Sequence, residues 1–291
     1  MMSWKTRDDM SRLIIEAGKT ERHYWADIWR YRELFFFLSW RDILVRYKQT
    51  TIGVLWALIR PVLTIAIFTV IFGKMAKMPS GGIPYPVFVC AGTLPWQFFA
   101  TAMGEASNSL IVNANMLSKI YFPRLIVPAS AVIVAFADLL ISLVILAALM
   151  AWYQVMPTWR LLALPLFTLL GLGAALGTGL WLAALNVKYR DFRYVIPFVV
   201  QFGFFISPVG YSRDALHQKL GDTFLGKTIY QLYPFNPMDG VINGFRWAIG
   251  GRSTLPLDWN SVLISVAVVI LIMAFGLRYF RSTEKNFADI I

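Results

Sequence analysis

Residues 125–152 read LIVPASAVIVAFADLLISLVILAALMAW, and the only charged side chain among them is Asp138. A helix needs about 20 mainly apolar residues to cross the hydrocarbon core of a bilayer. The apolar residues here run continuously instead of alternating, which is typical of a helix and not of a membrane β-strand. A helix also satisfies its backbone hydrogen bonds internally, as lipid requires. The stretch therefore predicts a membrane-spanning helix.

Five other segments of the 291-residue chain have a similar character, although one of them, residues 194–210, is at the lower limit of length. The six expected spans lie at about 52–72, 87–109, 125–152, 161–185, 194–210 and 260–279. The composition agrees, because 58% of the residues are hydrophobic and 15% are charged, whereas a soluble domain carries roughly 25% charged residues. We expect an all-α membrane protein with six transmembrane helices, forming one domain over residues 51–291.

The charges between the expected spans indicate the orientation. With the N-terminus inside, the cytoplasmic segments hold 18 of the 27 Lys and Arg residues, and the outer segments hold 8. Lys and Arg are enriched in the cytoplasmic loops of membrane proteins. We therefore expect both termini in the cytoplasm, with residues 1–31 forming a cytoplasmic N-terminal segment. This distribution also accounts for the net charge of +11 without a nucleic acid partner.

Two further hydrophobic stretches are too short to span. Residues 32–48, RELFFFLSWRDILVRYK, place four apolar or aromatic side chains on one helical stripe, namely Phe36, Trp40, Ile43 and Tyr47. We interpret residues 32–50 as an amphipathic helix in the membrane interface, the alternative being an ordinary soluble amphipathic helix. The second stretch, Val241–Ile249, lies in an outer segment, 212–250, that is rich in Gly, Pro and aromatic residues.

No motif for catalytic chemistry stands out. Ala17-Gly18-Lys19-Thr20 resembles the end of a phosphate-binding loop, but Leu13 occupies the position of its first glycine. The two histidines, His23 and His217, are far apart and have no partnering cysteines, so we expect no metal site. Small residues in the fourth expected span have the wrong spacing for a dinucleotide loop and favour close helix packing instead; they are Gly171, Gly173, Gly177 and Gly179.

Three ionisable side chains fall within the expected spans, namely Arg60, Glu105 and Asp138. Charged groups are costly in a bilayer, so they normally face protein or a wet cavity. We expect Arg60 to pair with Glu105 or Asp138 across helices. The alternative is a proton or ion relay, but a relay would need several carboxylates on adjacent turns.

Aromatic residues make up 15% of the chain. Many Trp and Tyr residues suit the two membrane interfaces, but Trp56, Trp96, Phe98 and Phe99 lie within or near the interiors of expected spans. Sugar rings stack their C–H faces on aromatic rings, so a wide path lined by such side chains would let a neutral glycan slide. Core packing is the alternative, and the safer interpretation for any one of them.

Short motifs in a fixed order along most of the chain carry a family resemblance. They include Arg41–Lys48 (RDILVRYK), Gly53–Ala57 (GVLWA), Phe68–Gly73 (FTVIFG), Tyr189–Asp191 (YRD), Ser207–Val209 (SPV) and Phe287–Asp289 (FAD). From about residue 33 to the C-terminus, the chain resembles the permease subunits of ABC-2-type exporters of cell-surface polysaccharides, such as O-antigen, capsule and teichoic acid. Arg60 departs from the pattern, because the family commonly carries a neutral residue there. Two roles stay open for it: biasing the path towards an acidic or phosphate-bearing substrate, or pairing with a carboxylate as above.

The resemblance implies that ATP is hydrolysed elsewhere. Two copies of a separate ATP-binding subunit would bind ATP and magnesium, so this chain would carry no cofactor and no catalytic residue. Two copies of this chain would form a homodimer with the translocation path between them. Residues 113–122 would be the coupling helix that docks into the ATP-binding subunit. The implied coupling residues are Asn113, Asn115, Leu117, Lys119, Tyr121 and Phe122.

The resemblance also implies a lipid-linked polysaccharide substrate, moved outward across the bacterial inner membrane. Its anionic pyrophosphate head would meet a basic entrance formed by Arg41, Arg46, Tyr47 and Lys48. The side chains expected to line the path are Trp56, Arg60, Trp96, Phe98 and Phe99. Residues 212–250 would form short re-entrant helices that cap the exit.

Two other functions stay open at this point. A small-molecule or drug exporter of the same ABC-2 type is the nearer alternative. An ion-coupled secondary transporter would instead need carboxylates at the bilayer midplane and an internal repeat, and the sequence contains no convincing repeat.

Overall fold

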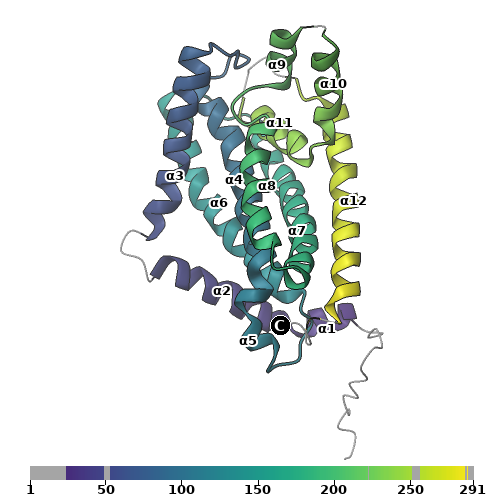
Figure 1. Ribbon diagram of the computed structural model, residues 1–291. Helices are drawn as coiled ribbons and strands as arrows, with labels where there is room; N and C mark the ends of the chain where they lie inside the picture. The colour runs from purple at the N-terminus through teal and green to yellow at the C-terminus, as the bar shows by residue number, and fades with distance from the viewer. Residues whose placement is uncertain (1–23, 49–52, 222, 251–255, 286, 288–291) are drawn as a thin grey trace, which may run out of the picture.

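The computed structural model describes residues 24–48, 53–221, 223–250, 256–285 and 287. Every regular element within these ranges is a helix (Figure 1). The α-helices are α1 (Tyr24–Arg30), α2 (Arg32–Lys48), α3 (Gly53–Phe68), α4 (Tyr85–Val112), α5 (Ala114–Leu117), α6 (Ile126–Trp152), α7 (Leu164–Lys188), α8 (Phe192–Ile206), α9 (Arg213–Leu220), α10 (Phe224–Leu232), α11 (Pro237–Ile249) and α12 (Trp259–Glu284). A π-helix, Thr69–Met75, continues α3, and short 3-10 helices, Trp159–Ala163 and Tyr233–Phe235, precede α7 and α11.

Five helical segments of the described chain are long and apolar enough to cross a membrane. They are Leu58–Met75, Tyr85–Val112, Ile126–Trp152, Trp159–Lys188 and Trp259–Glu284. The expected fifth span corresponds to α8, which is apolar but has 15 residues. At 1.5 Å of rise per residue, α8 is about 22 Å long, less than the hydrocarbon thickness of about 30 Å. The all-helical prediction is confirmed for the described residues, with five candidate spans and one shorter apolar helix.

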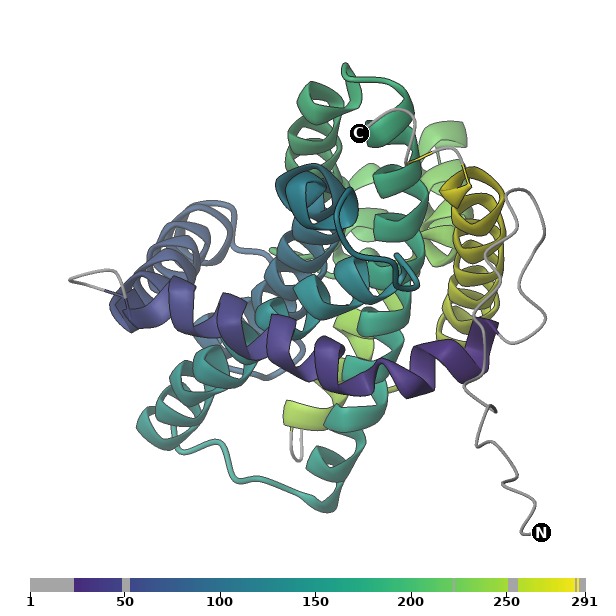
Figure 2. The same ribbon diagram turned by 90° about the horizontal axis from the view of Figure 1, so that it is seen from below.

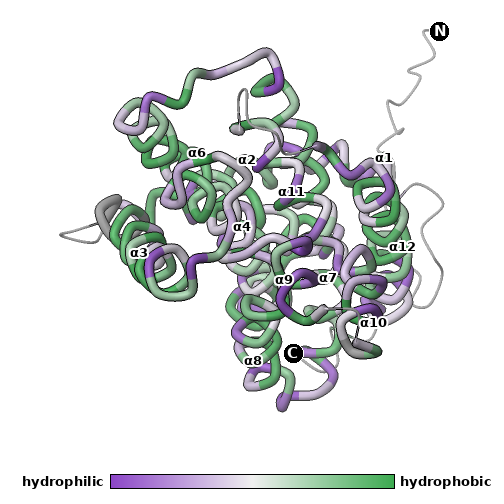
Figure 3. The backbone as a smooth tube through the Cα atoms, turned by 90° about the horizontal axis from the view of Figure 1, so that it is seen from above, coloured by the Kyte–Doolittle hydropathy of each residue, from purple (hydrophilic) through white to green (hydrophobic). Residues whose placement is uncertain are grey.

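The outward faces of the long helices are apolar, as contact with lipid requires. Exposed large hydrophobic side chains include Leu63, Ile67, Leu140, Val144, Leu166, Phe202, Leu263 and Ile270. Seen from above, α3 and α6 are largely hydrophobic on the sides that face away from the rest of the protein (Figure 3). Soluble monomers rarely expose apolar surfaces of this extent. The protein is therefore a multi-pass membrane protein.

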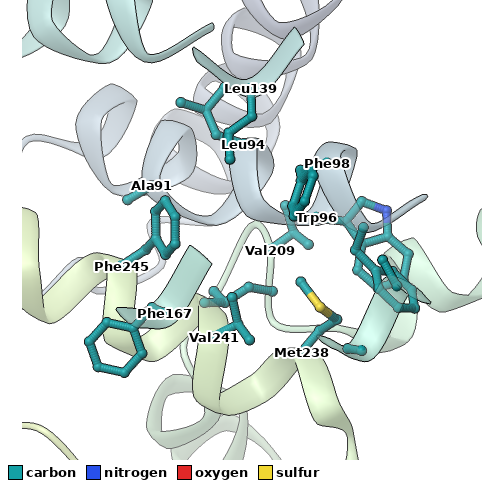
Figure 4. Packing of buried hydrophobic residues seen from close by; sticks show 14 of the residues in the cluster. Ala91, Leu94, Trp96, Phe98, Leu139, Phe167, Val209, Met238, Val241 and Phe245 are labelled. Atoms are coloured by element: carbon teal, nitrogen blue, oxygen red, sulfur yellow. The ribbon is translucent and has the colours of Figure 1, made fainter. Parts of the chain in front are cut away.

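The central helix is α4, which is buried along most of its length, whereas α3 is mostly exposed. Leu94 of α4 lies beside Leu139 of α6, and Ala91 of α4 lies beside Phe245 of α11 (Figure 4). Lipid tails are as apolar as these side chains, so exclusion of water gives little driving force for helices to associate within the bilayer. Close van der Waals packing around α4 is what holds the spans together.

Glycines allow α7 and α12 to pack with their backbones in contact. A Cβ atom on Gly276 would overlap the carbonyl oxygen of Gly177, and one on Gly177 would lie 2.8 Å from the backbone of Met273. On another side of α7, Gly179 faces Ala106 of α4. The prediction that the glycines of the expected fourth span serve close helix packing is confirmed at Gly177 and Gly179.

Three short helices, α9, α10 and α11, gather at one end of the bundle, and α1, α2 and α5 lie at the other (Figure 1). We call these the α9 end and the α2 end. The apolar helix α11 is buried against α4, α7 and α12. Its Arg246 is 3% exposed, lies over the ring of Phe88, and donates hydrogen bonds to the carbonyl oxygens of Val209 and Tyr211. These bonds pair both Nη atoms of the buried guanidinium with backbone dipoles and fix α11 among the spans.

At the α2 end, α1 and α2 run across the ends of the spans, from α12 towards α3 (Figure 2). The segment expected as an interface helix is helical over Arg32–Lys48. Phe36 and Trp40 of the predicted stripe are exposed, whereas Ile43 and Tyr47 are half-buried. The apolar stripe is thus only partly covered by the protein.

The contact between α7 and α12 gives a stability prediction. Replacing Gly276 by Ala should force α12 away from α7 and destabilise the protein by about 1–3 kcal/mol, because overpacking a tight contact costs that much. Gly104→Ala is the matched control, since a Cβ atom there meets nothing within 4 Å. Thermal unfolding in detergent should distinguish the two variants, and equal melting temperatures would contradict the packing argument.

Candidate functional site

A cavity of about 700 Å³ lies between α2, α3, α4, α6 and α8. Its polar lining consists of Arg46, Tyr47, Arg60, Gln97, Thr101, Asp138, Ser142 and Gln201. Its aromatic lining consists of Trp96, Phe98, Phe204 and Phe205. Binding cavities commonly combine apolar walls with a few polar groups that fix orientation. This lining can offer hydrogen bonds to hydroxyl groups and ring faces to an apolar surface.

One guanidinium neutralises two carboxylates at a wall of this cavity. Arg46, near the end of α2, forms a close ion pair with Glu105 of α4. Its Nη1 atom also lies 3.0 Å from Oδ2 of Asp138 on α6. The neighbouring Tyr47 donates a hydrogen bond to Oδ1 of Asp138. We call these four residues the Arg46 cluster, and they tie α2 to two of the spans.

The surroundings of the Arg46 cluster keep its α2 groups protonated. Burial lowers the pKa of Arg46, but the carboxylates of Glu105 and Asp138 outweigh this effect, so the pKa lies above its ordinary value. Burial, together with the hydrogen bond to Asp138, raises the pKa of Tyr47 well above its ordinary value. The guanidinium therefore stays charged and the phenol stays a donor across the physiological pH range.

The predicted ion pairing of the intramembrane charges is correct for the carboxylates but wrong for the cation. Glu105 and Asp138 do pair across helices, but their partner is Arg46. Arg60 is exposed, lines the same cavity as Asp138, and forms no ion pair with the residues that the structure describes. The sequence pattern placed Arg46 in an interface helix at the cytoplasmic entrance, and it was not predicted as a partner of the carboxylates in the spans.

The side chains expected to line a glycan path have different environments. Trp96 and Phe98 line the cavity, but both are largely buried. Phe99 packs against Trp96, with 5.4 Å between ring centroids, and is also buried. Trp56 lies in α3, and its side chain falls outside the described residues. The contribution of α8 to the cavity was not predicted, because the aromatic spacing of Phe204 and Phe205 is equally typical of any apolar helix.

Two of the basic residues expected at the entrance are already held by polar groups of the protein. Arg41 pairs with the adjacent Asp42 at 2.7 Å and donates to Oδ1 of Asn113 at 3.1 Å. Arg46 is held within its cluster. Lys48, the last residue of α2, is exposed. The entrance therefore offers fewer available cations than its sequence indicates.

The segment expected as a coupling helix is helical for only one turn. Ala114–Leu117 forms α5, and turns follow it as far as Phe122. Leu117 and Phe122 are buried in a small apolar cluster at the α2 end. The exposed side chains of the predicted set are Asn115, Lys119 and Tyr121. The buried pair anchors the segment, and the exposed residues are the ones available to a partner.

Both ends of this segment are connected to other helices. At its start, Asn113 accepts the hydrogen bond from Arg41 of α2 described above. At its end, the backbone N–H of Arg124 donates to Oε1 of Glu284 at 2.8 Å. Oε2 of Glu284 accepts a hydrogen bond from the Tyr24 hydroxyl at 3.0 Å. The segment is therefore linked to α1, α2 and the end of α12.

A second cavity, of about 410 Å³, lies beside this segment. Its lining residues are Ile111, Ala114, Asn186, Val187, Arg190, Arg193 and Tyr194. Asn186 of α7 donates to the carbonyl oxygen of Ser107 and to Oδ1 of Asn108, which joins α7 to α4 here. Over the described ranges, no group of three or more His, Cys, Asp or Glu side chains is placed to hold a metal ion.

Comparison with known proteins supports a transport role. Residues 33–250 match the family described as ABC-2 type transporter. The chain is 26% identical to the O-antigen export system permease protein RfbA of Myxococcus xanthus, covering 91% of this chain and 98% of the relative. It is 25% identical to a protein of the same name from Klebsiella pneumoniae, covering 89% and 95%. It is also 23% identical to the polysialic acid transport protein KpsM of Escherichia coli, covering 84% and 91%.

The Arg46 cluster can be tested by a double-mutant cycle. Arg46→Gln should destabilise the protein, because it leaves Glu105 and Asp138 without their cation. Combining it with Glu105→Gln should recover part of the loss, with a coupling energy of about 1 kcal/mol or more.

Thermal unfolding of the purified protein measures both effects. Lys48→Gln serves as the control, since it removes a charge from an exposed position on the same helix, where a charge contributes little to stability. Strictly additive effects of Arg46→Gln and Glu105→Gln would contradict the cluster.

Proposed function

The chain belongs to the family of ABC-2 type transporters, and we propose that it is the membrane-spanning permease of an ATP-driven exporter of a lipid-linked cell-surface polysaccharide. The observation that carries this proposal is the cavity between the spans, whose lining joins aromatic rings to amide and hydroxyl groups. Such a surface suits sugars, which present hydroxyl groups at their edges and C–H groups on their faces. The names of the relatives, which refer to O-antigen export and polysialic acid transport, point to the same substrate class.

The alternative of a small-molecule exporter is less well supported. The similarity to the polysaccharide-related proteins extends over most of this chain and most of each relative. A relay for ion-coupled transport is also disfavoured, because Glu105 and Asp138 share one cation instead of following one another along a path.

We assign six spans, with α8 as the fifth, and place both termini in the cytoplasm of a bacterial cell, with the protein in its inner membrane. The α2 end is then cytoplasmic, and the α9 end is external, with α9–α11 as re-entrant or capping helices. The excess of Lys and Arg at the α2 end supports this orientation. The proposed domains are a cytoplasmic segment (1–31), an interface helix (32–50) and the six-span domain (51–291).

The energy source is proposed to lie in a partner. Two copies of this chain form a homodimer and bind two copies of an ATP-binding subunit, which carry the ATP and magnesium. The exposed part of residues 113–122 docks into that subunit, and its links to Arg41 and Glu284 pass the movement to α2 and α12. ATP drives transport only if it binds one conformation of the complex more tightly than another.

In the proposed mechanism, the lipid-linked glycan enters from the cytoplasmic leaflet beside α2. Lys48 attracts the anionic head of the lipid at the surface. The glycan then follows the cavity, whose lining combines aromatic rings with hydroxyl-binding groups. Closure of the ATP-binding subunits moves the glycan outward, and α11 with its neighbours covers the exit.

The coupling role predicts a separation between folding and transport. Changing exposed Lys119 to Glu, together with exposed Ile120 to Ser, should abolish co-purification of the ATP-binding subunit and lower polysaccharide export at least about tenfold. The amount of protein in the membrane should not change, because both side chains point away from the apolar cluster. Lys219→Glu on α9 is the control at the opposite end, and equal export by the two variants would contradict the coupling role.

The orientation predicts which sites are accessible from outside. In a Cys90→Ala background, which removes the single native cysteine, cysteine replaces exposed Gln218 on α9 or exposed Ser282 on α12. A membrane-impermeant maleimide should label the Gln218→Cys variant in intact spheroplasts and the Ser282→Cys variant only after lysis. Labelling of Ser282→Cys in intact spheroplasts would contradict a cytoplasmic C-terminus.

A further inference from the structure

Arg60 is a cation of the cavity that no carboxylate of the described chain neutralises. It lies about two helical turns after Gly53, the start of α3, and its side chain is exposed. It lines the same cavity as Gln97 and Thr101 of α4, so part of this exposed side chain faces the cavity. Intramembrane Arg residues normally face the interior of a bundle or a water-filled cavity, and they pair there with an acceptor.

The neighbouring charges explain why no carboxylate that the structure describes serves as this acceptor. Glu105 and Asp138, which the sequence offered as partners of Arg60, are both engaged by Arg46. Arg41 is likewise paired with Asp42. A guanidinium has five N–H donors in a planar fork, which matches the oxygen atoms of a phosphate or carboxylate group.

We propose that Arg60 binds an anionic group of the transported substrate inside the cavity, which makes it a specificity-determining residue. This inference rests on the proposed function, since it takes the substrate to be a lipid-linked glycan. The anion is either the diphosphate that joins the glycan to its lipid or an acidic group on the glycan itself. Gln97, Thr101 and Gln201 line the same cavity and supply hydrogen-bonding partners for sugar hydroxyls.

The first experiment measures export in cells. Arg60→Gln removes the charge and should lower surface polysaccharide about tenfold while lipid-linked glycan accumulates inside, because a charge-assisted pair is lost. Arg60→Lys keeps the charge without the planar fork and should retain an intermediate level. The control is Lys74→Gln, a charge removal at an exposed position on the continuation of the same span, outside the cavity lining. Normal export by Arg60→Gln would overturn the proposal.

The second experiment identifies the source of the anion. The full-length protein in lipid nanodiscs is titrated with geranylgeranyl diphosphate, with oligogalacturonate as a carboxylated glycan, and with a neutral dextran oligosaccharide. Arg60→Gln should bind one of the two anionic probes about tenfold more weakly than the wild type and leave dextran binding unchanged. Weaker binding of the diphosphate identifies the lipid linker, and weaker binding of oligogalacturonate identifies the glycan. Unchanged binding of both anionic probes would overturn the proposal and leave phospholipid or a second copy of the chain as the partner of Arg60.

The two proposals fail in different ways. If the wild-type chain did not restore surface polysaccharide to a deletion strain, the proposed function would be wrong, and the nanodisc titrations would still decide the role of Arg60. If Arg60→Gln exported normally while the Lys119 and Ile120 variant did not, the anion site would be wrong and the exporter function would stand.

Discussion

Two carboxylates on neighbouring candidate spans share one guanidinium, and that guanidinium comes from α2, which is not among the candidate spans of the described chain. Glu105 and Asp138 would be costly in lipid without a cation, and Arg46 supplies it from α2. The helix α2 is therefore a part of the bundle and not a surface appendage. The cluster also fixes one wall of the cavity, so the shape of the proposed path depends on α2 staying where it is.

The apolar part of the structure obeys a different constraint. Within a bilayer, helices associate through close packing and not through exclusion of water, so the buried contacts depend on shape. Gly177 and Gly276 bring two backbones together, and the fully buried Arg246 is tolerated because carbonyl oxygens at 2.7 and 3.0 Å accept its hydrogen bonds. Along α4, the packed apolar core includes Leu94, Phe98 and Ala102, between Phe88 beneath Arg246 and Glu105 beside Arg46.

Hydropathy predicted the long spans because continuous apolar runs leave a membrane chain few other conformations. It predicted α8 less well, since this mainly apolar helix of 15 residues is too short to cross a bilayer along its normal and too long for a loop. Residues 113–122 were predicted as a helix but form one turn, because burial of Leu117 and Phe122 sets that backbone. The site was harder to predict, since the choice between Arg46 and Arg60 as the partner of Asp138 depends on how α2 lies across the spans, which no local pattern encodes.

The hydrogen bonds around residues 113–122 explain how a movement at the α2 end can reach the cavity. Asn113 contacts Arg41, which lies on the same helix as Arg46, so a displacement of the segment acts on α2 and through it on the carboxylates of α4 and α6. On the other side, Arg124 and Glu284 connect the segment to α12, which packs rigidly on α7 through glycine contacts. In each case a polar contact links the segment to a helix that packs against others. Packed helices move as units instead of deforming continuously. A partner that binds one position of the segment more tightly would therefore shift the position of whole spans, and with them the width of the cavity that Arg60 lines.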